Sequence, residues 1–299
     1  MLKLNETQLV EMAVLTEVAP PPGGPIFPYR ITNTGTVPAL PGVGSITYNV
    51  KVGDRATGLA ADHVEPCVST KIYGSSPDQQ AINKGVNVLC QIGNPARVIS
   101  GDAKGAKGVV TGKHGGIEHV MIDFADKDLD RMAIGDKILV RAKGLGMQIV
   151  GRPDIKVMNL DPKLFYKLGL SEQRDGKIEV DVAKIVPAKI MGSGLGANQC
   201  YSGDYDIQMF DQATNEEYGL ADIRFGDVVL IEDADHSYGR SYITGATSIG
   251  IVVHSDCVTS GHGPGVCTIL ASREGAFVPR LTPKANLGHY LKIGRMRRK

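Results

Sequence analysis

The sequence predicts a mainly β chain of the α+β class, with barrel-like or sandwich-like sheets and a few peripheral helices. Three features predict it: alternating apolar and polar residues, nearly continuous apolar runs, and frequent turn residues. Alternation with a period of two is typical of strands buried on one face, and continuous runs are typical of strands buried on both. The 299 residues include 37 glycines and 16 prolines, so the chain turns often.

Strands are predicted in both halves of the chain. Alternating residues predict strands over residues 46–52 and 178–182, the second of them directly after the turn at Asp175–Gly176. Apolar runs predict strands that are buried on both faces at Lys137–Val140, Val228–Ile231 and Ile249–Val253.

Few helices are predicted. Ser76 and Pro77 form a good N-cap and first turn for a helix that runs toward Lys84. Asp161 and Pro162 begin a short helix that Gly169 can end. The proline-rich segment 19–28 predicts an extended lead-in without helix.

A short pattern, an apolar residue followed by Gly-Asp, occurs at Gly53–Asp54, Gly135–Asp136 and Gly226–Asp227. Glycine allows positive φ and aspartate accepts hydrogen bonds from nearby backbone, so each pair predicts a turn that leads into a strand. A change of composition near Gly151–Pro153 predicts a boundary between two closely packed β-rich domains, residues 1–152 and 153–299.

Composition excludes several functional classes. The net charge is +1, which gives no driving force for binding nucleic acid or an anionic membrane. The long charge-free stretch at residues 31–50 contains Pro38 and Pro41 and does not fit a membrane span. The five cysteines form no CxxC pair, which predicts reduced thiols and a cytoplasmic protein. Near-zero charge and many short strands predict a homo-oligomer.

Three segments carry candidate ligands for a metal ion. The first is Asp62-His63-Val64-Glu65, in which acidic and imidazole groups lie within four residues. Charged residues beside a proline also fit a plain solvated loop, and both interpretations stay open. His63 and Glu65 are the candidate ligands here.

The second segment, residues 108–124, is a glycine-rich hairpin with two histidines. His114 lies at the turn and His119 begins the next strand. Along that strand Val120, Ile122 and Phe124 share one face, and His119, Met121 and Asp123 share the other. Glycines bring the backbone close to a neighbour, so Gly115 and Gly116 are candidates for substrate binding through their amides.

The third segment spans residues 200–265. Asp204 and Asp206 are two residues apart, so both carboxylates lie on one side of an extended chain. Asp233 and Asp235 follow a predicted buried strand, and His254 lies where the next strand ends. His262 lies in a Gly-His-Gly-Pro-Gly loop.

At two levels these segments resemble known families. The strings at residues 101–120, 224–240, 249–256 and 261–266 resemble an uncharacterised prokaryotic family known only as a domain of unknown function. Gly203–Asp206, Gly226–Asp227 and Asp233–Gly239 are similar to motifs of the acetamidase/formamidase family, which implies a similar fold for residues 153–299. The segment departs from that family's motif at Asp235, which takes the place of a histidine, and at Arg240, where an acidic residue is expected.

Together the residues and the resemblance predict a metal-dependent hydrolase that cleaves a carbon–nitrogen bond in a small amide. The alternatives are a non-catalytic small-molecule-binding or assembly protein on an enzyme-like scaffold, and an enzyme with Cys67 or Cys257 as nucleophile. The expected ion is zinc, with calcium or manganese as alternatives. The His114–His119 hairpin and the segments Asp204–Asp206 and Asp233–Asp235 are expected to line one cleft. The candidate metal ligands are His63, Glu65, His114 and His119; the candidate catalytic residues are Asp206, Asp233 and His254; the candidate substrate-binding residues are Gly115, Gly116 and Tyr238.

Overall fold

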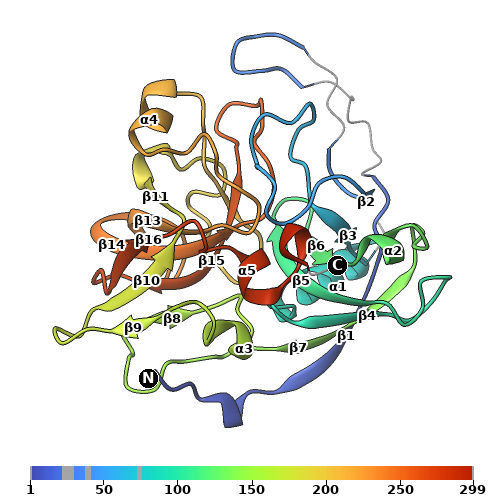
Figure 1. Ribbon diagram of the computed structural model, residues 1–299, viewed down its shortest axis with the longest axis horizontal. Coiled ribbons are helices and arrows are strands. Elements are labelled where there is room, and N and C mark those ends of the chain that lie inside the picture. Colours follow the sequence, from blue (N-terminus) through green and yellow to red (C-terminus); the bar gives the residue numbers. More distant parts are fainter. Residues whose placement is uncertain (1, 22–29, 38–41, 73–75, 298–299) are drawn as a thin grey trace.

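The computed structural model describes residues 2–21, 30–37, 42–72 and 76–297. Within these ranges the chain is mainly β and forms sheets of seven, six and three strands, which curl around one another rather than stack flat (Figure 1). The seven-stranded sheet is built from residues 11–143, and the other two from residues 156–281. The mainly β class and the small number of helices are therefore confirmed.

The seven-stranded sheet is antiparallel, with strand order β1-β7-β4-β5-β6-β3-β2 along the described chain. Strands β5 and β6 form the glycine-rich hairpin at its centre. Its strands are β1 (Glu11–Glu17), β2 (Ile46–Thr47), β3 (Cys67–Thr70), β4 (Pro95–Val98), β5 (Lys107–His114), β6 (His119–Asp123) and β7 (Lys137–Lys143).

The six-stranded sheet has the order β11-β13-β14-β15-β12, with β8 paired to β15. Its strands are β8 (Lys156–Val157), β11 (Lys184–Pro187), β12 (Tyr205–Asp206), β13 (Val228–Asp235), β14 (Ser241–Val252) and β15 (Gly265–Ser272). In the small sheet β10 lies between the other two, and its strands are β9 (Ser171–Glu172), β10 (Ile178–Val182) and β16 (Phe277–Leu281).

The helices are short and peripheral. The predicted helix after Ser76 is confirmed as α1 (Pro77–Leu89), and the predicted short one as α3 (Pro162–Phe165), where the Asp161 carboxylate accepts a hydrogen bond from the Lys163 amide. None of the described helices is both long and apolar enough to cross a bilayer. Residues 22–28 of the expected extended lead-in lie outside the described residues. The remaining helices are α2 (Asp126–Leu129), α4 (Gln212–Glu217) and α5 (Leu287–Leu291). Single 3-10 turns lie at Glu6–Gln8, Ala188–Ile190 and Gly294–Met296.

The strand predictions are confirmed by β7, β10, β13 and β14 but are mostly wrong for residues 46–52. There only Ile46–Thr47 forms a strand, although Val50 and Val52 are buried as the alternation indicated. The Lys51 amide donates to the Asp54 carboxylate, so the chain already turns at Lys51 and leaves the sheet. Val50 and Val52 are buried in two hydrophobic clusters and not by strand pairing.

The three Gly-Asp turns are confirmed and share one geometry. Each glycine has positive φ, and each aspartate Oδ2 accepts a hydrogen bond of 2.9 Å from the amide three residues earlier. The turns at Asp136 and Asp227 lead directly into β7 and β13, whereas the turn at Asp54 does not lead into a strand.

The hydrophobic core joins the sheets through β6. Val120, Ile122 and Phe124 pack in a cluster on one face of the seven-stranded sheet, as the alternation predicts. Met121 points the other way, into a cluster that also contains residues of β10, β13, β14 and β15. The five cysteines, all of which are described, are buried and unpaired. The packing of β6 against the second half of the chain places the hairpin turn beside the loops of the six-stranded sheet.

Candidate metal centre

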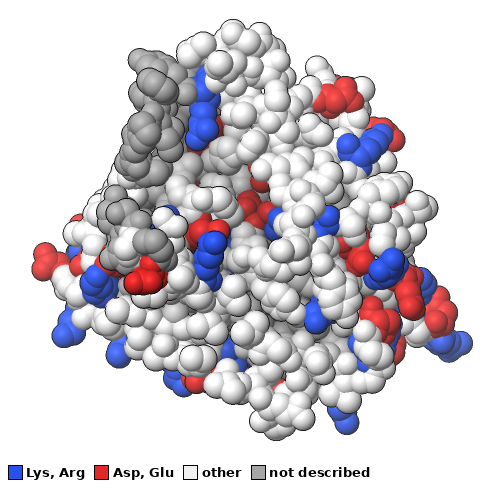
Figure 2. Space-filling view, turned by 180° about the vertical axis from the view of Figure 1, so that it is seen from behind, with Lys and Arg blue, Asp and Glu red and all other residues white. Residues whose placement is uncertain are grey.

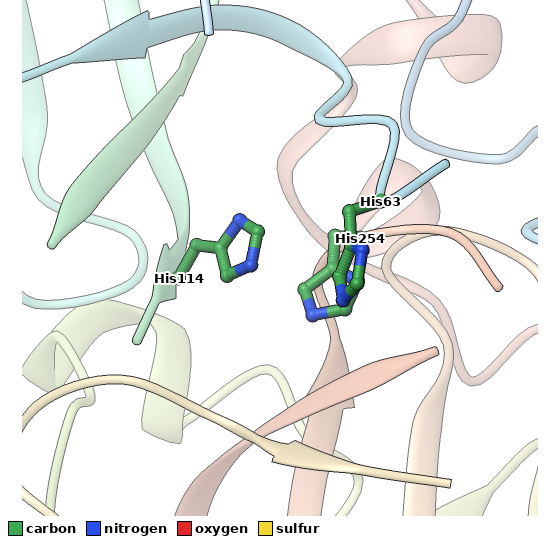
Figure 3. Close-up of side chains that lie close together, drawn as sticks. All are labelled: His63, His114 and His254. Atoms are coloured by element: carbon green, nitrogen blue, oxygen red, sulfur yellow. The ribbon is translucent and has the colours of Figure 1, made fainter. Parts of the chain in front are cut away.

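Four histidines from distant parts of the chain meet where the two larger sheets approach each other. His63 lies in the loop before β3, His114 ends β5, His254 follows β14, and His262 lies in the loop before β15. We refer to these four residues as the histidine cluster. Figure 3 shows the rings of His63 and His254 next to each other, with the ring of His114 directed toward them.

The rings lie close together. The centroids of His114 and His254 are 4.2 Å apart, and His63 lies 5.0 Å from His254 and 5.6 Å from His114. His262 lies 5.5 Å from His63, and among the described residues it makes no ring contact with His114 or His254. All but His262 are buried. The cluster is therefore elongated, with His114 and His262 at its two ends.

Backbone carbonyl groups fix the tautomers of two of the rings. Nδ1 of His254 donates to the Ser255 carbonyl at 2.8 Å, and Nδ1 of His262 donates to the Ser260 carbonyl at 3.1 Å. A carbonyl oxygen only accepts hydrogen bonds, so Nδ1 carries the proton in both rings. In the neutral rings, Nε2 then carries the lone pair that a metal ion needs.

Carboxylates hold the other two rings by the same atom. Nδ1 of His63 lies 3.0 Å from Asp62, and Nδ1 of His114 lies 2.6 Å from Glu65. A carboxylate that accepts from the far nitrogen of an imidazole is a common support of histidine ligands in metal sites. All four histidines thus have Nδ1 engaged and Nε2 left to bind.

Two aspartates complete the centre: Asp206, in β12, and Asp204, the residue directly before that strand. Asp204 Oδ2 lies 2.6 Å from Nε2 of His254, and Asp206 Oδ1 lies 3.5 Å from the same atom. The buried Asp204 Oδ2 and His254 Nε2 have no hydrogen bond of acceptable geometry in spite of their proximity. When Nε2 of His254 is protonated, the two atoms form a close contact between opposite charges.

Burial and charge act against each other in this centre. Burial opposes the charged form of His254, but the carboxylates of Asp204 and Asp206 raise its pKa well above the usual value. Burial also acts against ionised Glu65, yet His119 and His114 hold its pKa well below the usual range. Without a bound cation, these opposite charges compensate one another inside the protein.

Ligand atoms within 4.8 Å of one another occur in four sets among the described residues. In the set of Asp62, His63 and Cys257, burial raises the pKa of the Cys257 thiol to about 12. Without a bound ion the thiol therefore stays protonated, and the Asp62 carboxylate of this set supports Nδ1 of His63. The other three are His63–His114–His254, His63–Asp206–His262 and Asp204–Asp206–His254.

Long-range contacts hold His63 in place. The adjacent Val64 amide donates to the Ser255 hydroxyl at 2.7 Å, and the Ser255 amide donates to the Val64 carbonyl at 3.0 Å. His63 itself has φ of 51°, a left-handed conformation that costs a non-glycine residue on the order of 1–3 kcal/mol. Such strain is typical of functional sites, where the surrounding structure keeps a side chain in a required position.

Two predicted ligands support the cluster from behind. Both Glu65 oxygens are engaged, by the two hairpin histidines, the Ser69 hydroxyl and the Gly44 amide. His119 donates to Glu65 and belongs to none of the sets of converging ligand atoms. The alternation on β6 correctly placed His119 on the face opposite Val120, but the partner of His119 there is the buried Glu65 carboxylate. We therefore assign Glu65 and His119 to positioning His114, and not to the converging ligand atoms.

The predicted substrate-binding residues are not free at the centre to bind a substrate. The Gly115 amide donates to Asp204 Oδ1 at 2.7 Å, so it holds a carboxylate and is not free for a substrate. Gly116 is exposed at the hairpin turn. Tyr238 is 82% exposed and lines a cavity of about 610 Å³ that contains no residue of the histidine cluster. Neither Gly116 nor Tyr238 belongs to the centre.

Asp233 lies at the other end of the six-stranded sheet, contrary to the prediction of one shared cleft. Its carboxylate accepts from the Gly245 amide at 2.7 Å, before β14 reaches Thr247. His254 follows Val252, at the opposite end of the same strand. The strand between these ends is roughly 20 Å long at about 3.3 Å per residue. A strand has two ends, and the sequence does not show which of them faces the hairpin.

Asp204 and His262 belong to the centre although we did not count them as ligands from the sequence. The signal for Asp204 was its two-residue spacing from Asp206, which does place both carboxylates together. His262 gave no signal beyond a glycine-rich loop.

Seen from behind, the molecule has a hollow near the middle of its surface, and acidic side chains are visible inside it (Figure 2).

The fold and the centre define a mainly β protein with a buried site of imidazole and carboxylate groups shared between its two halves. Family profiles for the N-terminal and C-terminal parts of DUF4438, a domain of unknown function, match residues 29–166 and 167–291. The chain belongs to this family. His63 and His114 come from the N-terminal match, whereas Asp204, Asp206, His254 and His262 come from the C-terminal match.

A solved structure, titled "Crystal structure of TM1086", is similar over nearly the whole length. Its sequence is 46% identical, the TM-score is 0.90, and the match covers 96% of this chain and 98% of that one. No curated protein matches the sequence.

Proposed function

We propose that this protein is a hydrolase whose activity depends on a divalent metal ion bound by the histidine cluster. The observation that carries the proposal is the common geometry of the four histidines. Each has Nδ1 engaged by a carboxylate or a carbonyl, each belongs to a set of converging ligand atoms, and Asp204 and Asp206 converge with His254 in one of these sets. Imidazole with carboxylate favours zinc, with manganese as the alternative, over calcium, which prefers oxygen ligands.

Such a centre suits hydrolysis because a bound divalent ion lowers the pKa of water and polarises a carbonyl group. The water oxygen bonds to the carbonyl carbon, the carbon–nitrogen bond breaks, and the nitrogen leaves with a proton that came from the water. Asp204, which lies beside His254, is the carboxylate in position to carry that proton. The products are a carboxylate and an amine or ammonia.

The choice of a small amide as substrate depends on the sequence resemblance to the acetamidase/formamidase family. Of the resembling segments, Gly203–Asp206 contributes two carboxylates to the centre. The segment Asp233–Gly239 lies outside it, and its first residue serves the Gly245 turn. The proposal of a related fold for residues 153–299 has the same basis.

Metal content and ammonia release test the proposal together. Protein purified without chelators is expected to contain zinc or manganese in stoichiometric amount and to release ammonia from formamide, acetamide or a longer aliphatic amide. His254→Ala should lose both properties. His289→Ala is the matched control, because His289 lies in α5 and belongs to none of the converging ligand sets.

Two outcomes would overturn the proposal. Wild-type protein that binds neither zinc nor manganese at micromolar concentration has no metal centre of this kind. Stoichiometric metal without hydrolysis of any amide in the panel would instead favour the non-catalytic binding protein that the sequence left open.

A further inference from the structure

We infer that the centre holds two metal ions rather than one, with Asp206 as the bridging carboxylate. The inference rests on the proposed metal binding and specifies how the ligands are shared. It starts from the elongated shape of the cluster, in which His114 and His262 lie at opposite ends.

One ion does not reach all of the ligands. Zinc ligands lie about 2.0–2.2 Å from the ion, so any two ligand atoms of one ion are at most about 4.4 Å apart. His114 belongs to a converging set with His63 and His254, and His262 belongs to one with His63 and Asp206. Within the described chain, no set of atoms inside 4.8 Å contains both His114 and His262. The ligands therefore extend over more than one coordination sphere.

Asp206 faces both ends of the cluster with different oxygens. Its Oδ1 lies 3.5 Å from Nε2 of His254, and its Oδ2 lies 4.0 Å from Nε2 of His63. Oδ2 also accepts a hydrogen bond of 3.3 Å from the Gly263 amide, which fixes the orientation of the carboxylate. A carboxylate directed this way bridges two ions, which in two-metal hydrolases lie about 3.5–4 Å apart.

The side chains then divide into two ligand sets. The inner ion takes His254, Asp204 and Oδ1 of Asp206, whose ligand atoms converge within 4.8 Å of one another, and His114 lies beside this set through its contact with His254. The outer ion takes His63, His262 and Oδ2 of Asp206, because Nδ1 of His63 is engaged by Asp62 and only Nε2 is available.

The outer ion has three protein ligands and a free position for water, which is the pattern of catalytic zinc sites. His262 is also the most exposed residue of the cluster, so this ion lies on the solvent side. When bound, the outer ion would polarise the carbonyl group of the amide, and the open position of the inner ion would hold the attacking water.

Manganese alone, added to the full-length protein, tests the number of ions. Wild type is expected to retain two Mn²⁺ per chain after desalting and to give the paramagnetic resonance spectrum of an exchange-coupled pair. His262→Ala, in a partly exposed loop, should retain one ion with the spectrum of isolated Mn²⁺ and should lose amide hydrolysis. His63→Ala should behave in the same way, whereas His289→Ala should retain the coupled pair.

The possible failures are distinguishable. One Mn²⁺ per wild-type chain overturns the two-ion inference and leaves the proposed function intact. Two Mn²⁺ in His262→Ala overturn the assignment of His262 to the outer ion. Loss of both ions in His262→Ala, with an unchanged melting temperature, overturns the division into separate ligand sets. No bound Mn²⁺ or Zn²⁺ in the wild type overturns the proposed function itself.

Discussion

Replacing Gly265 with alanine places a methyl group where the ligand atoms of the centre converge. The added Cβ would lie within 3.0 Å of both Asp204 Oδ2 and His254 Nε2, closer than Cβ atoms are found in proteins. Gly265 does not have positive φ, so the backbone itself accepts alanine. The substitution therefore tests the two side chains and not the strand.

The size of the effect follows from the steric conflict. Both buried side chains must withdraw by roughly 1 Å, whereas metal–ligand distances tolerate only about 0.2 Å. Two ligands of the inner ion are displaced, so we expect the dissociation constant for Zn²⁺ to rise at least about 100-fold, or about 2.7 kcal/mol. Because excess volume in a packed interior costs about 1–3 kcal/mol, the protein should still fold.

Titration calorimetry with Zn²⁺ measures the affinity, and thermal unfolding in chelator measures the stability of the metal-free protein. Gly85→Ala is the control, because a Cβ at that position of α1 meets no atom within 4 Å. It should bind Zn²⁺ like the wild type and unfold at the same or a higher temperature. A Gly265→Ala protein that is folded and keeps wild-type affinity would refute the reasoning about the position of the centre.

Three other predictions concern the rest of the molecule. Burial, with Arg240 nearby, lowers the pKa of His236 to about 3 from 6.5, so the folded state binds fewer protons between these values. The free energy of unfolding should thus fall as pH drops from 6.5 toward 3, and this one group contributes up to about 5 kcal/mol of the loss. Urea unfolding of His236→Asn should therefore show a shallower dependence on pH than that of the wild type. Arg297→Ala leaves the buried Asp123 carboxylate without its ion pair, and should lower the free energy of unfolding by about 1–3 kcal/mol; an unchanged value would show that the pair is not formed. Light scattering should give a mass above the 31.8 kDa of one chain, because the edge strand β1 exposes Met12 and Leu15; a single-chain mass would contradict association.

Local patterns carried much of the fold. The Gly-Asp turns at Asp54, Asp136 and Asp227 were predictable because glycine torsions and an aspartate that accepts from backbone act within four residues. The faces of β6 were predictable because side chains alternate along any strand. The predicted strand at residues 46–52 failed since an alternating pattern shows that residues are buried, and does not show what buries them.

The residue types of the centre were also visible in the sequence. Histidine and aspartate occur at the ends of predicted strands, and the spacing of Asp204 and Asp206 alone places both carboxylates on one side. These are properties of one segment at a time, and each depends on torsion angles of neighbouring residues. The kinds of ligand, and so the expectation of a metal ion, came from the sequence by itself.

Only the tertiary structure decided which of these groups meet. His119 and Glu65 are as good ligands by type as His114, yet they pair with each other behind it. Asp233 and His254 both lie at strand ends, but the register of β13 with β14 places them at opposite ends of the sheet. Convergence depends on how the two sheets pack through contacts between residues far apart in the sequence, and local patterns do not encode those distances.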